Sequence, residues 1–394
     1  SNKAIHYYAD DGVIKDDSLF EICTNILSAS GVESPLIILP DISKKNERIS
    51  PTGIALSSRS HIIPSAVPAA NGSGVRVLKL EISYDDINKD ILQTFLRMLS
   101  LSVPIYGYDS PKLLRPLLRK EDLMNIYAYG AKWAQERLNL EENHDNIESL
   151  GRLGGISHND KRLHHNFPEY FIKQGLYGFG VLESGNHFIE LQYIDKIIDE
   201  KLAKLIGVSE RQIIVMIHDG NPATLAGQYY HPVPFSKKKD SAIFEKDKYI
   251  YHFEKNKTSN KLDRLRYFSP STPYYSIEAN SDEAERYMLL MNAACNYGFA
   301  NRVAITKAVL NSIKHSLRIE AIDYALLTDT LHDCVKHTEI DGSFTYVHRH
   351  GASEAQPSTR FNANHIFSKT GQVIGIPGSP GRHSLLCAAG IGTE

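Results

Sequence analysis

The chain has 394 residues, of which 42% are hydrophobic and 23% are charged. This composition is typical of a soluble globular protein and excludes a disordered or fibrous chain. Lys and Arg number 44 and Asp and Glu 46, giving a formal net charge of -2, so a nucleic-acid partner must be held by a local basic groove. Because no apolar run approaches the roughly 18–20 residues of a membrane span, and no signal-peptide pattern opens the chain, we expect a cytoplasmic protein.

The first half of the chain predicts strands and helices in alternation. A strand is expected at residues 5–8, a helix at 17–29, and several short strands from Pro35 onward, where apolar runs are separated by Gly, Pro and Asn. Two helices are expected at 89–101 and 120–138. The polar stretch at 141–166 is expected to be a loop.

The second half predicts an α+β fold in one large domain without a clear linker. The expected elements are a strand at 178–193, a helix at 195–205, a strand at 212–217, a long helix at 281–317, and strands at 321–330, 343–348 and 373–376. Between them, residues 228–264 contain the runs SKKKD and EKNKTSNK, which predict an exposed insertion.

Three histidines lie at or near the ends of predicted strands. His187 occurs in ESGNHFIELQ, His218 in VMIHDGNP and His332 in LTDTLHDCVKH. Imidazole is the commonest metal ligand in proteins, although a single histidine at a strand end is more often an ordinary core or rim residue. Three such histidines together favour a metal site.

Several longer motifs resemble the RtcB family of RNA ligases. They are IIPSAVPAANGSGVR at 62–76, GNHFIE at 185–190, MNAACNYGFANR at 291–302, HRHGAS at 348–353 and GIPGSPG at 375–381. The resemblance runs from about Pro40 to Gly381. It implies an α+β fold with layered β-sheets around a deep central cleft flanked by helices.

The resemblance also implies a reaction and its cofactors. Members of this family join an RNA 2′,3′-cyclic phosphate or 3′-phosphate to a 5′-hydroxyl with GTP and two Mn ions, a phosphoryl transfer in which cations neutralise the phosphates. By resemblance, the metal ligands are His187, His218 and His332. The nucleotide-binding positions are Asn186, Glu190, Gly351, Ala352, Pro377, Gly378 and Ser379. Resemblance or adjacency makes Arg76, Arg302, Arg349 and Arg382 candidates for RNA contact; the alternative is that they pair with acids.

The sequence departs from the family at positions that carry charge. Ala70 stands where the family has a metal-binding Asp and Ser73 where it has a bridging Cys, and neither replacement supplies the lost negative charge. Further departures are Ser43 for His, Asp219 and Ala223 in the anion loop, Asp333 for Asn and His350 for Lys. The sequence ends at Glu394, before the family's His-Gly-Ala-Gly-Arg motif. The guanylylated histidine therefore has no counterpart here, and no covalent GMP adduct is expected.

Three interpretations follow from these departures. The first is an RtcB-type protein whose ligase activity is impaired or lost. The others are a noncatalytic RNA- or partner-binding pseudoenzyme and a mononuclear metal-dependent hydrolase. At most one ion, Mn or Zn, is expected, and the three imidazole nitrogens should converge within roughly 3–4 Å. Alternatively the histidines hydrogen-bond to water and to acids such as Asp219 and Asp333.

Overall fold

The computed structural model describes residues 5–8, 17–32, 35–44, 49–105, 117–165, 167–220, 226–232, 241–255, 263–269, 273–340, 342–379 and 381–390. Helices and several sheets alternate along these ranges, which confirms the α+β prediction. In the described part of the chain, no helix combines the length and the apolar character needed to cross a membrane.

The helices have starts and stops that the sequence explains. Ser281 caps the long helix α10 by accepting a hydrogen bond from the amide of Ala284, and Asn88 caps α2 in the same way. The helix expected at 120–138 is two helices, because Gly130 has φ 55° and an added Cβ there would lie 2.2 Å from the Gly151 carbonyl oxygen. The bounds are α1 Asp17–Ser28, α2 Lys89–Ser102, α3 Lys120–Tyr129, α4 Ala131–Leu138, α5 Lys161–His165, α6 Glu169–Tyr177, α7 Glu200–Ile206, α8 Ala226–Tyr230, α9 Ser241–Ile250 and α10 Asp282–Leu317.

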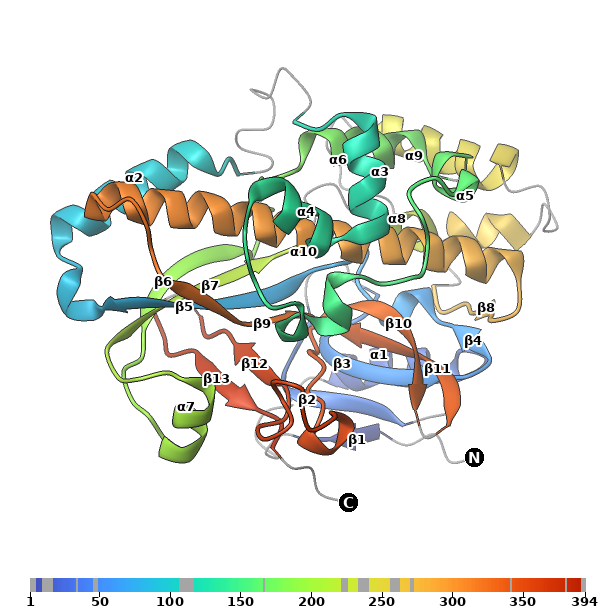
Figure 1. Cartoon of the computed structure of the whole chain (residues 1–394). Coiled ribbons are helices and arrows are strands. Elements are labelled where there is room, and N and C mark those ends of the chain that lie inside the picture. Colours follow the sequence, from blue (N-terminus) through green and yellow to red (C-terminus); the bar gives the residue numbers. More distant parts are fainter. Residues whose placement is uncertain are drawn as a thin grey trace.

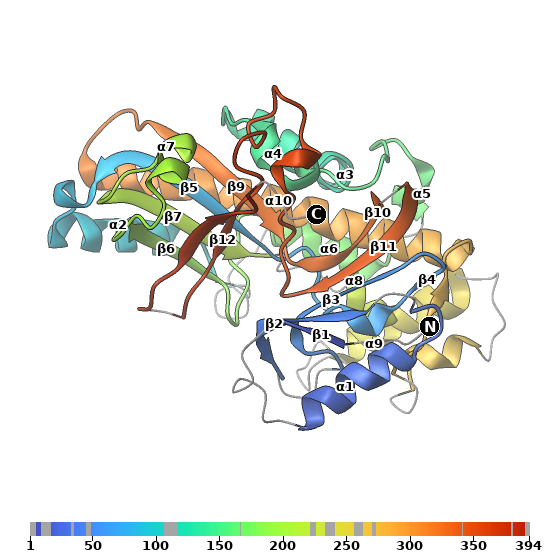
Figure 2. The same ribbon diagram turned by 90° about the horizontal axis from the view of Figure 1, so that it is seen from below.

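The described strands form two larger sheets and two ribbons (Figures 1 and 2). The five-stranded sheet has the order β1 Ile5–Tyr7, β2 Leu36–Ser43, β3 Thr52–Ser58, β11 Ser343–His350 and β10 Asp333–Ile340. The four-stranded sheet has the order β6 Phe188–Tyr193, β7 Gln212–Asp219, β5 Gly74–Ser83 and β9 Tyr324–Leu331. The ribbons pair β12 Val373–Ile376 with β13 Leu385–Ala388, and β4 His61–Ile62 with β8 Ile277–Glu278.

The four-stranded sheet is buried on both faces. Helices α10 and α2 cover one face, where Leu80 of β5 lies with Phe95 and Ile313 around a small apolar void (Figure 1). On the other face Val77 packs under the β12–β13 ribbon, which approaches closely because Gly375 has no side chain. Burial on both faces explains the continuous apolar run of β7, from Ile213 to Ile217.

Other observed elements also differ from the expected ones. The strand expected at 178–193 begins only at Phe188. The stretch at 141–166 contains short helical turns at 144–146, 148–151 and 161–165. Strand β10 was not predicted, because the pattern of its first half resembles a loop that follows β9.

The segment at 228–264, expected to be an exposed insertion, is exposed at some of its described residues, such as Ile243 and Tyr249, and buried at others. Lys248 is 1% exposed and its Nζ donates to the His231 carbonyl oxygen at 2.6 Å. Aromatic side chains in and beside the segment form a buried cluster; they include Tyr229, Tyr230, Phe244, Tyr251 and Tyr267. The SKKKD run lies outside the described residues. The aromatic residues between the charged runs therefore make this segment part of the core.

A buried ionic network ties the four-stranded sheet to α10. Asp329 on β9 accepts hydrogen bonds at 2.8 Å from Arg76 Nη1 through one carboxylate oxygen and from Arg302 Nε through the other. Arg76 also donates to Thr306 Oγ1 at 2.9 Å and pairs with Glu142. Both arginines are 0% exposed. Such a network is stable only while every charge keeps its partner.

This burial corrects the expectation of RNA contacts for three arginines. Arg76 and Arg302 are enclosed by the network, and Arg349, 4% exposed, pairs through Nη2 with Glu148 Oε1 at 2.5 Å. Their guanidinium groups cannot reach a bound phosphate without breaking buried ion pairs, so the prediction is wrong for these residues. Arg382 is exposed, and for it an RNA contact stays a prediction.

The network predicts a large effect of Asp329→Asn on stability. Removing the charge leaves two buried guanidinium groups short of compensation, so the free energy of unfolding should fall by about 3–5 kcal/mol. Asp85→Asn is the control, because it removes an exposed carboxylate that pairs with Arg211, and the free energy of unfolding should change far less than in Asp329→Asn. Urea unfolding of both variants measures this; equal costs would contradict the proposed importance of the network.

Candidate functional site

The register of the four-stranded sheet gathers four polar side chains at one edge. Gly74, the first residue of β5, pairs with Asp219 at the end of β7 and with Leu331 at the end of β9. Because these strands are antiparallel, the residue before β5 and the residue after β9 meet at this edge. These residues are Ser73 and His332.

The other two side chains come from β6 and β7. Phe188, the first residue of β6, pairs with His218 near the end of β7, so His187 lies next to His218. The rings of His187 and His218 are 4.8 Å apart between centroids. Segments as far as 259 residues apart in the sequence therefore contribute to one cluster. We call it the histidine cluster: Ser73, His187, His218 and His332.

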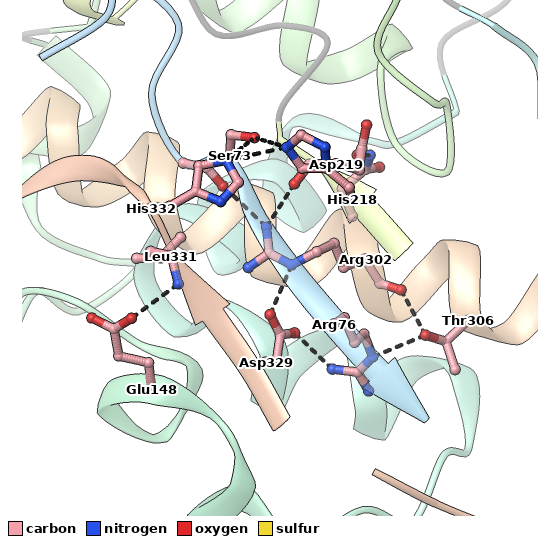
Figure 3. A network of polar contacts seen from close by, with 12 residues as sticks. Ser73, Arg76, Glu148, His218, Asp219, Arg302, Thr306, Asp329, Leu331 and His332 are labelled. Carbon is pink, nitrogen blue, oxygen red and sulfur yellow. Dashed lines mark hydrogen bonds and ion pairs between the residues drawn. The ribbon is translucent and has the colours of Figure 1, made fainter. Parts of the chain in front are cut away.

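The three imidazoles point their Nε2 atoms at one hydroxyl. Ser73 Oγ lies 3.0 Å from His187 Nε2, 3.3 Å from His218 Nε2 and 3.1 Å from His332 Nε2. The Nε2 atoms of His218 and His332 are 3.1 Å apart. The structure thus brings the three histidines together around Ser73 (Figure 3 shows His218, His332 and Ser73).

His218 and His332 are held in the neutral form, in which a ring nitrogen can act as a ligand. Burial, the largest cause, lowers the pKa of both His218 and His332 well below the usual value, and the neighbouring imidazoles lower it further. His187 Nδ1 lies 3.3 Å from the Ser184 carbonyl oxygen. Donation of this N–H to the carbonyl leaves the Nε2 lone pair facing the cluster.

The nearby acids have different orientations. Asp333 Oδ2 lies 3.7 Å from His332 Nε2, whereas Glu183 Oε2 lies 3.6 Å from the other type of ring nitrogen, Nδ1 of His187. Asp219 uses its carboxylate to accept hydrogen bonds from the Glu183 amide and from Asn301 Nδ2. Burial raises the pKa of Asp219 to about 7. Asp219 therefore supports the loop, and Asp333 faces the cluster.

Arg302 fixes the segments that carry the cluster. Its Nη1 donates to the carbonyl oxygen of Gly72 at 3.0 Å and to that of Asp219 at 2.9 Å, while its Nε binds Asp329 (Figure 3). Gly72 precedes Ser73, Asp219 follows His218, and Asp329 lies on the strand that leads to His332. One guanidinium group thus joins three of the segments. This role was missed because a lone Arg in a helical pattern resembles a surface residue.

Glu148 supports the same edge from another direction. Its Oε2 accepts a hydrogen bond from the Leu331 amide at 2.9 Å, and its other oxygen binds Arg349. The nearby cations Arg349 and Lys336 lower the pKa of Glu148 to about 2, against the effect of burial. Glu148 was not predicted, because its segment was expected to be a loop.

The predicted nucleotide-binding residues lie in two groups, of which the first, Gly351 and Ala352, contacts Asp333 and His332. Gly351 donates its amide to Asp333 Oδ1 at 2.8 Å, and Ala352 donates to the His332 carbonyl oxygen at 3.1 Å. In the second group, Gln192 Nε2 contacts both Glu190 and Ser384, and Ser384 Oγ accepts a hydrogen bond from the amide of Gly378. Pro377 and Ser379 flank Gly378, and Asn186 is exposed beside His187.

The cluster fits one metal ion only if Ser73 or another oxygen completes it. Across the described ranges, no group of three or more His, Cys, Asp or Glu side chains is arranged to hold a metal ion. With Ser73 included, however, four polar atoms are separated by 3.0–3.3 Å in the contacts given above. A tetrahedron with edges of about 3.2 Å has its centre about 2.0 Å from each vertex, which suits zinc.

Comparisons with known proteins agree with the motifs. The family described as "tRNA-splicing ligase RtcB" matches residues 23–394. The tRNA-splicing ligase RtcB of Thermococcus kodakarensis is 28% identical over 404 residues, covering 98% of this chain and 76% of the relative. That of Nanoarchaeum equitans is 30% identical over 397 residues, with the same coverage. That of Methanococcus maripaludis is 26% identical over 393 residues, covering 94% of this chain and 72% of the relative. This chain therefore belongs to the RtcB family of tRNA-splicing ligases.

Proposed function

We propose that this chain acts on RNA ends that carry a 3′-phosphate or a 2′,3′-cyclic phosphate, using one metal ion at the histidine cluster. The observation that supports this most is the convergence of three Nε2 atoms within 3.3 Å of Ser73 Oγ. The family membership supports RNA as the substrate class.

The residues of the cluster would hold the ion through neutral nitrogen atoms. His187, His218 and His332 would donate their Nε2 lone pairs, and three nitrogen ligands favour Zn over Mn, which prefers oxygen. A bound ion would supply positive charge that polarises a phosphoryl oxygen. Arg302 keeps the ligand segments in place, which lowers the cost of ordering them when the ion binds.

The proposed ligase activity is impaired because the charges required by a second ion are absent. Two cations about 4 Å apart need anionic ligands between them. Ala70 has only a methyl group, and the hydroxyl of Ser73 is neutral. GTP, proposed by resemblance, would contact the two nucleotide groups around Gly351 and Gly378.

Two other functions are alternatives to the proposed one. A noncatalytic RNA- or partner-binding protein is favoured by the replacements at Ala70 and Ser73, whereas the burial of Arg76, Arg302 and Arg349 removes the phosphate contacts first expected for it. A mononuclear hydrolase would use the same three histidines but release a dephosphorylated or opened RNA end instead of joining it.

We expect the purified chain to bind no more than one zinc ion, and His218→Ala to abolish tight binding. The variant removes a central ligand of a site with only three nitrogen donors. Elemental analysis after dialysis against zinc measures the stoichiometry, with His6→Ala, which changes an exposed histidine on β1, as the control. Two tightly bound ions per chain, or equal binding by His218→Ala, would contradict the site.

The RNA reaction tests the function itself. We expect the chain to bind a short RNA with a 2′,3′-cyclic phosphate more tightly when zinc or Mn is present, and to join it to a 5′-hydroxyl RNA much more slowly than the Thermococcus kodakarensis relative. Gel analysis of labelled RNA with GTP and metal distinguishes joined, opened and unchanged ends. Joining as fast as by the relative would overturn the impairment, and metal-independent binding without reaction would favour the noncatalytic function.

A further inference from the structure

The carboxylate of Asp333 has a fixed orientation at the histidine cluster. Asp333 is the first residue of β10 and directly follows His332. Its Oδ1 accepts a hydrogen bond from the Gly351 amide at 2.8 Å, and its backbone carbonyl accepts one from the amide of Gly72 at 2.9 Å. With one oxygen anchored, the other faces His332 Nε2 at 3.7 Å.

This position is close to that of a ligand. Two ligands of a tetrahedral zinc site with bonds of about 2.0–2.1 Å are about 3.3–3.4 Å apart. The distance of 3.7 Å between Asp333 Oδ2 and His332 Nε2 exceeds this by only a few tenths of an ångström. The nitrogen concerned is the one that faces Ser73, so the carboxylate lies on the ligand side of the ring.

A carboxylate at this position would balance part of the positive charge of a bound ion. Three neutral imidazoles and a serine hydroxyl leave the two positive charges of an ion uncompensated in a largely buried site, which is costly. Glu183 is a poor candidate to compensate them, because it faces Nδ1 of His187, on the far side of that ring. Asp219 is engaged with Asn301 and the Glu183 amide.

We propose that Asp333 is the anionic ligand of this site and that, in place of the neutral Ser73 hydroxyl, it takes the fourth position on a single Zn or Mn ion beside the three histidines. The inference rests on the proposed metal site. Asp333 then replaces part of the charge that Ala70 and Ser73 do not supply, but it does so at the His332 side of the cluster. An oxygen donor also makes the site more favourable for Mn than three nitrogen atoms alone.

The test compares metal binding by the wild type, Asp333→Asn and Glu339→Gln. Asn keeps an oxygen that accepts the Gly351 hydrogen bond but removes the charge, whereas Glu339 is an exposed acid on the same strand whose loss changes the net charge equally. Titration with zinc against a chromophoric chelator gives the dissociation constants. We expect Asp333→Asn to weaken zinc binding at least about tenfold and Glu339→Gln to leave it unchanged.

The outcomes separate this inference from the proposed function. A wild-type chain that binds no zinc defeats the metal site and, with it, the ligand. Zinc binding that is equally tight in the wild type and in Asp333→Asn defeats only the role of Asp333.

An infrared measurement on the wild type does not depend on whether the variant folds. The carboxylate stretching bands should shift when zinc is added to the wild type, and zinc binding without such a shift would also overturn the role of Asp333.

Discussion

The buried guanidinium of Arg302 is the constraint on which the arrangement of the site depends. It binds two backbone carbonyl oxygens, of Gly72 and Asp219, and the carboxylate of Asp329. Each of these groups belongs to a segment that ends in a side chain of the histidine cluster. The guanidinium is planar and its N–H donors have fixed directions. It therefore determines the distances between the three segments as well as holding them together. A lysine would supply the charge without that geometry.

This constraint explains why the imidazoles converge. Two neutral imidazoles can share a hydrogen bond when one of the facing nitrogens carries a proton, and the Nε2 atoms of His218 and His332 lie 3.1 Å apart and within 3.3 Å of the Ser73 hydroxyl. The sheet register and the Arg302 contacts hold the rings close together, so the fold supplies the free energy that this arrangement requires. A site organised in this way binds its ion with a smaller loss of conformational entropy.

The sequence predicted the parts of the site that follow from local pattern. His187 and His218 occur where apolar strand patterns begin or end, and the long helix at 281–317 shows a clear periodicity and a serine cap. It could not predict the partners of the arginines, since Arg76 and Asp329 are 253 residues apart and meet only through the pairing of β5 with β9. The charged runs at 228–264 suggested an exposed segment, whereas Phe244 and Tyr251, which lie between the runs, are buried. His332 follows a predicted strand in the same way, and β9 brings it to the same edge as the other two.

The central claim is that one ion fits at the centre of the histidine cluster. Anomalous diffraction at the zinc edge, from crystals of the intact chain equilibrated with zinc, tests it most directly. The account predicts one peak, about 2.0–2.1 Å from the Nε2 atoms of His187, His218 and His332. Two peaks at the cluster, or a zinc ion bound elsewhere while the three rings keep their contacts with Ser73, would contradict it.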